Sequence, residues 1–347
     1  MKITEFLVKH EKLYYFASVV WLGRKKSFRE KVNMINENPR QVIIENRGGL
    51  HRGKLIYELD PVVPNAGFFA VFRRLLSGLY YADDIGATPY ISFSKDFLYA
   101  EDGEINGTTE PFEYYFESIN TVTSEEIKHV NAVICFEPKH IRIAEIINGS
   151  RQLLYHVKDE YLTSMASIFA KYIHLNSVMD EYVNGSIKGL GLTNNTVAVH
   201  CRGTDYNIGS KEHPIIVTPE DYFIVVDEWI EKGYFDHVFL ATDDQKCLEK
   251  FIAHYGESLS FYADVERAKG NEGVHFSQSE RPNHKYRLGA EVIRDVYTMA
   301  SCSGLLAGMS EVSICTRIAK RSQNAIYRKE LILDKGIVLH GRSFSHN

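Results

Sequence analysis

Apolar positions along the chain follow two patterns that alternate. Short apolar runs predict strands, and longer stretches with apolar residues at i, i+3, i+4 and i+7 predict helices. The predicted helix over 65–86, for example, has Phe68, Val71, Phe72 and Leu75 at this spacing. The other elements predicted in the first half are strands 41–45, 54–59, 88–93 and 132–136 and one long helix over 159–190.

The second half alternates more regularly. Thr218 is a predicted helix cap, and it is followed by Pro219 and by two acids in the first turn. Asp243 is predicted to cap the helix that runs to His254. The remaining predicted elements are strands 196–200, 237–241, 259–263 and 303–307 and helices 283–300 and 310–321. This order predicts a doubly wound parallel sheet.

The length of 347 residues is a prior for two domains. We expect an N-terminal α/β domain over 1–190, a doubly wound domain over 191–325, and a C-terminal segment over 326–347 that packs back on the first domain. Two such domains face each other across a cleft between their strand tips. A cleft at a domain interface is the default place to look for a ligand.

Charge and cysteine content narrow the function classes. The formal net charge is -5 and the chain has no long run of Lys and Arg, which argues against nucleic-acid binding. The five cysteines are scattered without a CxxC pair, so we expect reduced thiols and no structural zinc site. No stretch reaches the ~20 apolar residues that a membrane span needs.

Residues 13–22 (LYYFASVVWL) are apolar and aromatic, with basic residues on both sides. The stretch 23–26 is not the small-residue cleavage site that a signal peptide needs. One interpretation is a segment that rests on an anionic membrane surface. The other, which we favour, is a packed first helix or strand with a solvated basic tail. We therefore expect a cytoplasmic protein, with peripheral contact to the inner membrane face as the alternative.

The most informative stretch is 197–205 (VAVHCRGTD), where an apolar strand ends in His200, Arg202 and Asp205. Ligands of open α/β sheets bind at the carboxyl ends of strands, and an arginine there suits phosphate oxygens. A second strand runs through Ser310 into a helix, whose N-terminus offers N–H groups to a phosphate. Together these groups could hold a diphosphate without a metal and stabilise its charge as it leaves.

Three of these residues also have structural interpretations. Arg202 could be an ion-pair partner of Asp205, although its place at the end of an apolar strand favours function. His200 could be a core histidine that is satisfied by its neighbours. Ser310 could be a plain helix cap.

The acidic candidates likewise have two interpretations each. The pair Asp243-Asp244 resembles a metal-binding pair, but N-capping explains it well and we favour capping. Asp295 lies in mid-helix near apolar residues, where a carboxylate needs partners. Those partners could be the two N–H donors of a guanine edge, or a salt bridge with Arg294 or a neighbour.

The stretch 200–205 resembles the strand ending in His-x-Arg that is shared by a family of fucosyltransferases. This family includes α1,6-fucosyltransferases, bacterial nodulation and α1,2-fucosyltransferases, and protein O-fucosyltransferases. In the same order, 239–244 (FLATDD) is similar to the family's ATDD strand, 292–297 (VIRDVY) to its helix with a guanine-reading aspartate, and Ser310 to its phosphate-contacting serine. In the first half, 65–69 (NAGFF) is similar to the family's Gly-Asn loop.

The chain departs from the family at two positions. Gly203 stands where a second arginine is common, and Glu311 puts an acid beside the expected diphosphate. The resemblance nevertheless implies a GT-B fold with two Rossmann-like domains, GDP-fucose as the donor, inversion of the anomeric centre, and no metal or other cofactor.

The resemblance also implies roles on the donor side. Arg202 would bind the β-phosphate, His200 and Asp295 the guanosine part, and Ser310 a phosphate. Further donor-side residues are expected to be Thr242, Asp243 and Glu311.

Inversion needs a general base for the acceptor hydroxyl. Some α1,6-type members place a glutamate just after the arginine motif, and the nearest match is Glu212, with Asp205 as the runner-up. Glu212 could equally be an exposed loop charge. Asn65, Phe68 and Phe69 are expected on the acceptor side, with core packing as the alternative for the two phenylalanines.

Four hypotheses follow. The first is a fucosyltransferase that transfers fucose from GDP-fucose to a growing bacterial-type surface glycan at the inner membrane face. The second is a GT-B transferase with a different nucleotide sugar. The third is a non-catalytic nucleotide-binding or glycan-binding module, and the fourth is a metal-dependent enzyme that uses Asp243 and Asp244.

Overall fold

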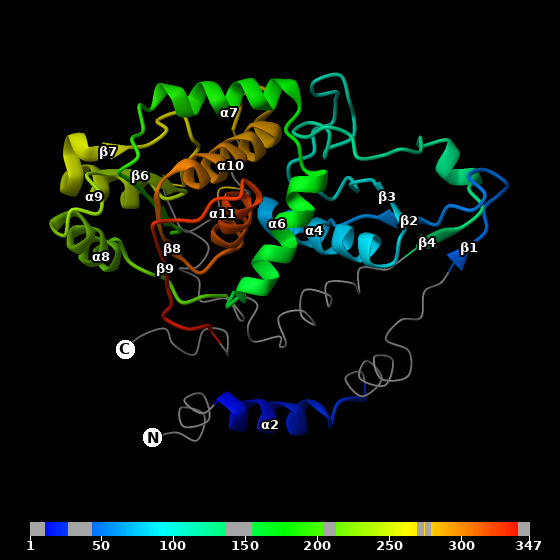
Figure 1. Cartoon of the computed structure of the whole chain (residues 1–347), viewed down its shortest axis with the longest axis horizontal. Coiled ribbons are helices and arrows are strands. Elements are labelled where there is room, and N and C mark those ends of the chain that lie inside the picture. The colour runs from blue at the N-terminus through cyan, green and yellow to red at the C-terminus, as the bar shows by residue number, and fades with distance from the viewer. Residues whose placement is uncertain are drawn as a thin grey trace. The chain divides into compact units, whose positions relative to one another are not determined.

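The computed structural model describes residues 11–26, 44–135, 155–203, 213–268, 274 and 279–338. Two compact units are present, Met1–Ile44 and Glu45–Asn347. The second unit carries nearly all of the described elements, including both sheets (Figure 1). The predicted division near residue 190 lies within this unit and stays a prediction.

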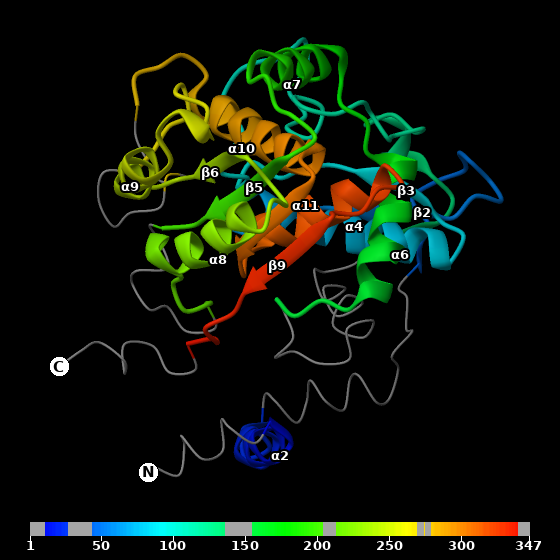
Figure 2. The ribbon, with the colours of Figure 1, turned by 60° about the vertical axis from the view of Figure 1, so that its left-hand side comes forward.

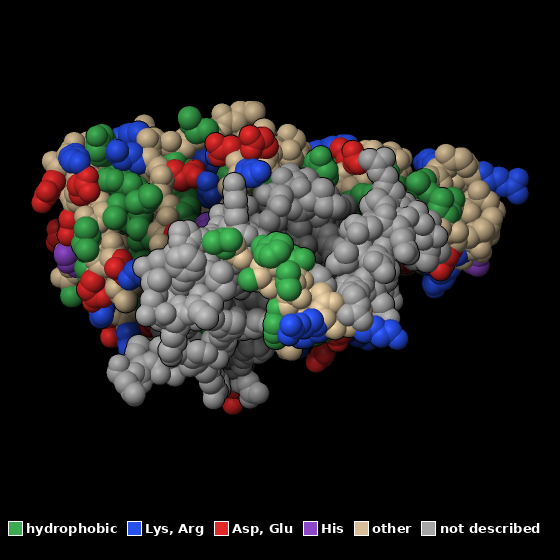
Figure 3. Space-filling model, turned by 90° about the horizontal axis from the view of Figure 1, so that it is seen from below, with side chains coloured by type: hydrophobic (Ala, Val, Ile, Leu, Met, Phe, Trp, Pro, Cys, Tyr) green, Lys and Arg blue, Asp and Glu red, His purple; other side chains and the backbone are tan. Residues whose placement is uncertain are grey.

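The first unit has one described helix, α2 (Glu11–Leu22), which confirms a helix in the apolar N-terminal stretch. Its large apolar side chains are exposed rather than packed: Leu13, Phe16, Val19, Val20 and Trp21. In Figure 3, green hydrophobic side chains of this kind lie beside blue Lys and Arg side chains near the centre of the view.

The first sheet has the strand order β1-β4-β2-β3. Its strands are β1 (Ile44–Glu45), β2 (Ile56–Leu59), β3 (Thr88–Ile91) and β4 (Val133–Cys135). β2 pairs in parallel with both β3 and β4. All four lie inside predicted strands, although residues 41–43 and 136 are outside the described ranges.

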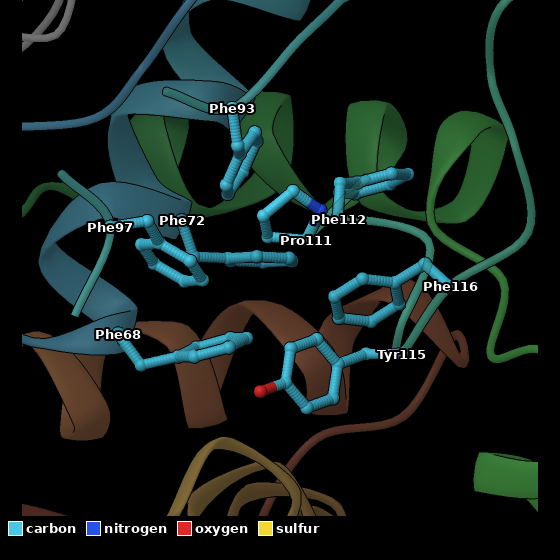
Figure 4. Close-up of a pocket in the computed structure, with 8 residues that line it drawn as sticks. All are labelled: Phe68, Phe72, Phe93, Phe97, Pro111, Phe112, Tyr115 and Phe116. Atoms are coloured by element: carbon cyan, nitrogen blue, oxygen red, sulfur yellow. The ribbon is translucent and has the colours of Figure 1, made fainter. Parts of the chain in front are cut away.

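The helix α4 (Phe68–Asp84) follows β2 and packs against β2 and β3. Its apolar residues form one face, as predicted, because their spacing matches the helical period. Figure 4 shows how the rings of Phe68 and Phe72 meet Phe93, Phe97 and the segment 111–116. These side chains leave a void of about 10 Å³, enough for at most one water molecule, so they form core rather than a ligand pocket.

The prediction of one long helix over 159–190 is wrong, because the chain forms two helices there. They are α6 (Asp159–Tyr172) and α7 (Ser177–Gly189). Ile173 is extended, and the Asn176 side chain caps α7 by accepting the Met179 N–H at 2.9 Å. Asn176 therefore starts a new helix, although the apolar spacing continues across the break.

The second sheet is fully parallel and has the order β7-β6-β5-β8-β9. Its strands are β5 (Thr196–Cys201), β6 (His237–Thr242), β7 (Leu259–Ser260), β8 (Gly304–Gly308) and β9 (Lys329–Leu333). The chain moves outward in one direction through β5, β6 and β7 and then returns to β8 on the other side of β5. This confirms the doubly wound parallel arrangement, with a topological switch point between β5 and β8.

Four helices connect these strands. They are α8 (Pro219–Glu231), α9 (Gln245–Tyr255), α10 (His284–Ser301) and α11 (Glu311–Ser322). Thr218 forms the predicted cap, in a capping box with Asp221. The cap of α9 is Asp244 and not Asp243 as predicted, because the Asp244 carboxylate accepts the N–H groups of Lys246 and Cys247.

Within the second unit, the part before about residue 190 (the first half) and the part after it (the second half) share an extensive packed core. α11 packs against α4 and α6, and α10 packs against α7 (Figures 1 and 2). β9 pairs with β8, so residues 329–333 of the C-terminal segment extend the second sheet. Directly after β9, Asp334 Oδ2 lies 2.6 Å from Nε2 of His156 in the first half, and the packing of the whole segment on that half stays a prediction.

Gly289 allows α10 to approach the first half closely. A Cβ at this position would lie 2.2 Å from the Tyr115 hydroxyl, which donates a hydrogen bond to the Tyr286 carbonyl. We expect Gly289→Ala to lower the free energy of unfolding by about 1–3 kcal/mol, measured by denaturant titration. Gly185→Ala, in an open position on α7, is the matched control and should raise it by up to ~1 kcal/mol. Equal effects at the two positions would contradict this account.

Candidate functional site

The two strands at the switch point end at one cavity. β5 ends at Cys201 and β8 at Gly308, and a cavity of about 560 Å³ lies beyond them, within the size range of ligand pockets. Both halves of the second unit contribute to its lining, which consists of Asn65–Ala70, Tyr99, Tyr155, His200, Arg202, His213, Ala241–Asp243, Val265, Glu266, Val274, Leu288, Glu291, Val292, Asp295, Glu311 and Val312. Every predicted site residue within the described ranges lines this cavity except Ser310.

Arg202 follows β5 directly and is half-buried at the cavity wall. Its positive charge acts on two neighbours: it adds to the lowering of the pKa of His200, and it partly offsets the rise that burial causes in the pKa of Glu311. The next residue must be glycine, because a Cβ on Gly203 would lie 2.4 Å from Asp244 Oδ2. Close packing of the α9 cap therefore explains why no second arginine stands at this position.

The Asp243-Asp244 loop shapes the cavity wall from β6. Asp243 Oδ1 accepts the Gly203 N–H at 3.0 Å, and Asp244 caps α9. The Thr242 hydroxyl accepts the Asp244 N–H at 3.2 Å. Both carboxylates thus have structural partners. Within the described ranges, no three His, Cys, Asp or Glu side chains are placed to hold a metal together.

His200 is buried, and burial together with the Arg202 charge lowers its pKa to about 3. The imidazole is therefore neutral near neutral pH. Its Nδ1 lies 3.4 Å from Ser310 Oγ, and the His200 carbonyl accepts the Tyr222 hydroxyl at 3.1 Å. His200 has the contacts of a satisfied core histidine and also lines the cavity.

Ser310 is the cap of α11. Its hydroxyl accepts the Ser313 N–H at 3.0 Å, its backbone N–H binds Ser313 Oγ, and only 1% of the residue is exposed. Glu311 already places a carboxylate in the first turn of this helix. The capping interpretation of Ser310 therefore fits the contacts, and its phosphate contact stays a prediction.

The N-terminus of α4 is arranged differently. All of 65–70 lines the cavity, and the N-cap is Gly67, which has no side chain, so the Phe68 N–H donates instead to the Tyr99 hydroxyl at 3.1 Å. The first turn has no acidic residue, so the partial positive charge of the helix end is not offset there. Asn65 just before it has a left-handed backbone (φ 63°). This helix end is a better anion site than the end of α11.

Phe68 and Phe69 open this helix and are both buried. Phe68 stacks into the aromatic core of Figure 4, with its ring edge-to-face to Tyr115 at 5.2 Å. The core interpretation of these residues therefore holds, while their helix end still borders the cavity. Their role on the acceptor side stays a prediction.

Asp295 presents a carboxylate from α10 to the cavity. Its expected alternative partner, Arg294, instead forms a bidentate pair with Asp264 at 2.7 and 3.0 Å and stacks on Tyr262. Burial raises the pKa of Asp295 to about 7, although Arg294 and Arg267 lower it. Within the described ranges, no hydrogen bond or ion pair of Asp295 to another residue is formed. The carboxylate can therefore accept hydrogen bonds from N–H groups that enter the cavity, and its contact with a guanosine stays a prediction.

Sequence reasoning missed Arg73, which carries a charge into the core. Arg73 lies on α4, is only 6% exposed, and places Nε 3.2 Å from Glu311 Oε2. The sequence did contain a signal, because Arg73 falls between the buried Phe69 and Leu76 at helical spacing. A charge on that face needs a buried counter-charge.

Two predicted catalytic residues, Asp205 and Glu212, lie outside the described residues. The identity of the general base stays a prediction. Among the described helices, none has the length and apolar character that crossing a membrane requires.

Solved structures similar to this chain are fucosyltransferases. The NodZ α-1,6-fucosyltransferase co-crystallized with GDP is 16% identical over 77% of this chain and 92% of its own, with a TM-score of 0.45. Fucosyltransferase NodZ from Bradyrhizobium is 16% identical over 83% of this chain and 97% of its own, with a TM-score of 0.46. POFUT1 in complex with GDP-fucose is 11% identical over 82% of this chain and 99% of its own, with a TM-score of 0.44. No family model and no curated protein matches the chain.

The pKa of Asp295 predicts a pH dependence of stability. Because this pKa is raised in the folded chain, the folded state holds the proton more tightly, and the free energy of unfolding falls as the pH rises from the ordinary aspartate value toward 7. We expect Asp295→Asn to stabilise the ligand-free protein by on the order of 2 kcal/mol at about pH 8 and by much less at about pH 4.

Asp264→Asn is the matched control. The Arg294 guanidinium lowers the pKa of Asp264, so this carboxylate stabilises the fold above its ordinary pKa and its loss should destabilise at about pH 8. Thermal melts at both pH values measure both effects. A destabilised Asp295→Asn protein at the higher pH would show that Asp295 has a structural partner instead.

Proposed function

We propose that this chain is an inverting, metal-independent glycosyltransferase of GT-B type that transfers fucose from GDP-fucose to a glycan. The observation that carries the proposal is the convergence on one cavity of the Arg202 guanidinium, the N-terminus of α4 with no acid in its first turn, and the Asp295 carboxylate. The first two suit a diphosphate, and the third suits the N–H donors of a guanine edge. The order of the motifs along the chain, which resembles the fucosyltransferases, supports the same donor.

In this proposal the chain acts mainly on the leaving group. When the bond between the anomeric carbon and the β-phosphate oxygen breaks, its electron pair and negative charge move to the diphosphate. Arg202 and the α4 terminus would stabilise that charge, so they lower the barrier without a metal. Glu212, or Asp205 in its place, would take the proton of the acceptor hydroxyl as its oxygen attacks the opposite face of the anomeric carbon, which inverts the centre.

Neutral His200 fits a supporting role. Its lowered pKa keeps the imidazole uncharged, so it adds no second cation beside Arg202 and can hydrogen-bond to the donor. Asn65 and the start of α4 would border the bound sugar and its acceptor. A bacterial-type surface polysaccharide or oligosaccharide is the acceptor class we propose.

Arg202→Ala should reduce fucose transfer from GDP-fucose by roughly 10²–10³-fold, because the charge on the leaving diphosphate loses its main stabilising cation. The fold should survive, since Arg202 follows the strand and is half-buried. Transfer is measured with a panel of glycan acceptors, and GDP binding by calorimetry. Arg287→Ala, at an exposed position on α10, is the control and should behave as the wild type. Near-normal turnover in Arg202→Ala would remove the proposed mechanism.

We also propose that α2 binds the anionic inner face of a membrane, where a surface glycan would be assembled. Phe16 and Trp21 on this helix are 72% and 60% exposed, and the exposed basic residues Arg24, Lys25 and Lys26 follow it. Apolar side chains beside basic ones are typical of helices that lie in a membrane interface.

Trp21 reports this contact. The chain has two tryptophans, and Trp229 is buried, so a Trp229→Phe variant leaves Trp21 as its one fluorophore of this type. We expect a blue shift of its emission with vesicles that contain anionic phospholipid, and little shift with purely zwitterionic vesicles. No shift with either would favour the packed-helix interpretation.

A further inference from the structure

Glu311 occupies an unusual place for an acid. It opens α11 directly after the cap at the end of β8, and it lines the cavity. Its Oε2 lies 3.2 Å from Arg73 Nε, with the two side chains 18% and 7% exposed. The contact joins α11 of the second half to α4 of the first half.

Three positive groups surround this carboxylate. Arg73 from α4 and Arg202 after β5 both favour its charged form, and the N-terminus of α11 does the same. Burial acts in the opposite direction and outweighs them, so the pKa of Glu311 is raised. The carboxylate is therefore held in place by cations and poorly solvated.

A diphosphate at Arg202 would bring further negative charge into the cavity that Glu311 also lines. Two like charges about 7 Å apart repel each other. At an effective dielectric constant of ~20 to ~40, the repulsion energy corresponds to a roughly tenfold weaker affinity. A site without this acid would bind the diphosphate more tightly. For a transferase, such tightness would also slow the release of the nucleoside diphosphate product.

We propose that Glu311, held in place by Arg73, is an internal counter-anion that competes with the nucleotide diphosphate for Arg202 and thereby limits its affinity. This inference rests on the proposed function, because it takes a nucleoside diphosphate as the ligand. It assigns Glu311 a role that sets how strongly the diphosphate is held, separate from the contacts that recognise the base.

A second ion pair on the same helix provides the comparison. Arg317 of α11 binds Glu330 of β9, with Nε and Oε1 2.6 Å apart and the side chains 13% and 24% exposed. Its burial and chemistry resemble those of the Arg73–Glu311 pair, but it does not line the cavity. A purely structural ion pair should behave alike at both places, whereas the proposal predicts an effect on ligands at Glu311 alone.

The experiment measures dissociation constants for GDP and guanosine by calorimetry. For Glu311→Gln we expect GDP to bind roughly tenfold more tightly than to the wild type, because the competing charge is gone. Guanosine has no phosphate and should bind both proteins equally. Glu311→Asp keeps the charge and should stay near the wild-type value, and Glu330→Gln should change neither constant.

Loss of Glu311 leaves the buried Arg73 without this counter-ion, which could destabilise the protein. The same substitution is therefore also made in the Arg73→Gln background, and Arg73→Gln/Glu311→Gln is compared with Arg73→Gln. The proposal predicts tighter GDP binding by the double variant.

Two results would overturn the inference while leaving the proposed function intact. One is unchanged or weaker GDP binding by Glu311→Gln, which would mean that Glu311 supports the arginines. The other is an equal change for GDP and guanosine, which would indicate a general structural effect. If the wild type binds no nucleoside diphosphate, the proposed function fails and the inference fails with it.

Discussion

The strand order of the second sheet brings the ends of β5 and β8 side by side, and the chemistry of the cleft follows from that pairing. Residues at these two ends are far apart in the sequence, yet Arg202 and Glu311 act on each other electrostatically at one cavity. The first half adds the start of α4 to the same space because α11 packs against α4. The ends of the parallel strands β5 and β8 thus form one side of the cavity, and the packing of α11 on α4 brings the other side against it.

The buried carboxylates at the cavity lower the stability of the folded protein. Asp295 and Glu311 both have raised pKa values because burial disfavours their charged forms. A fold selected for stability alone would place apolar or paired groups there. Two such carboxylates at one cavity with Arg202 are typical of a functional site, where charge is kept for a ligand. In our account Asp295 recognises the guanine base, and Glu311 limits the affinity for the diphosphate.

Local patterns in the sequence were sufficient for most of the fold, because apolar spacing and caps act over a few residues. The strand that ends at His200 and Arg202 and the Thr218 cap are examples. Errors arose where neighbouring signals compete or contacts are distant. Asn176 breaks a helix although the apolar spacing continues, and Asp244 rather than Asp243 caps α9 because its carboxylate reaches the helix N–H groups. The Arg73–Glu311 pair needs the packing of α4 on α11, which no local pattern reports.

The central claim is that this cavity binds a guanosine diphosphate through Asp295 at one end and Arg202 at the other. Calorimetric titration of the wild type and Asp295→Asn with GDP, UDP and dTDP tests it most directly. The account predicts that GDP binds the wild type most tightly, and that Asp295→Asn loses this preference while the fold remains intact. Tighter binding of UDP or dTDP than of GDP, or an unchanged preference in Asp295→Asn, would contradict it.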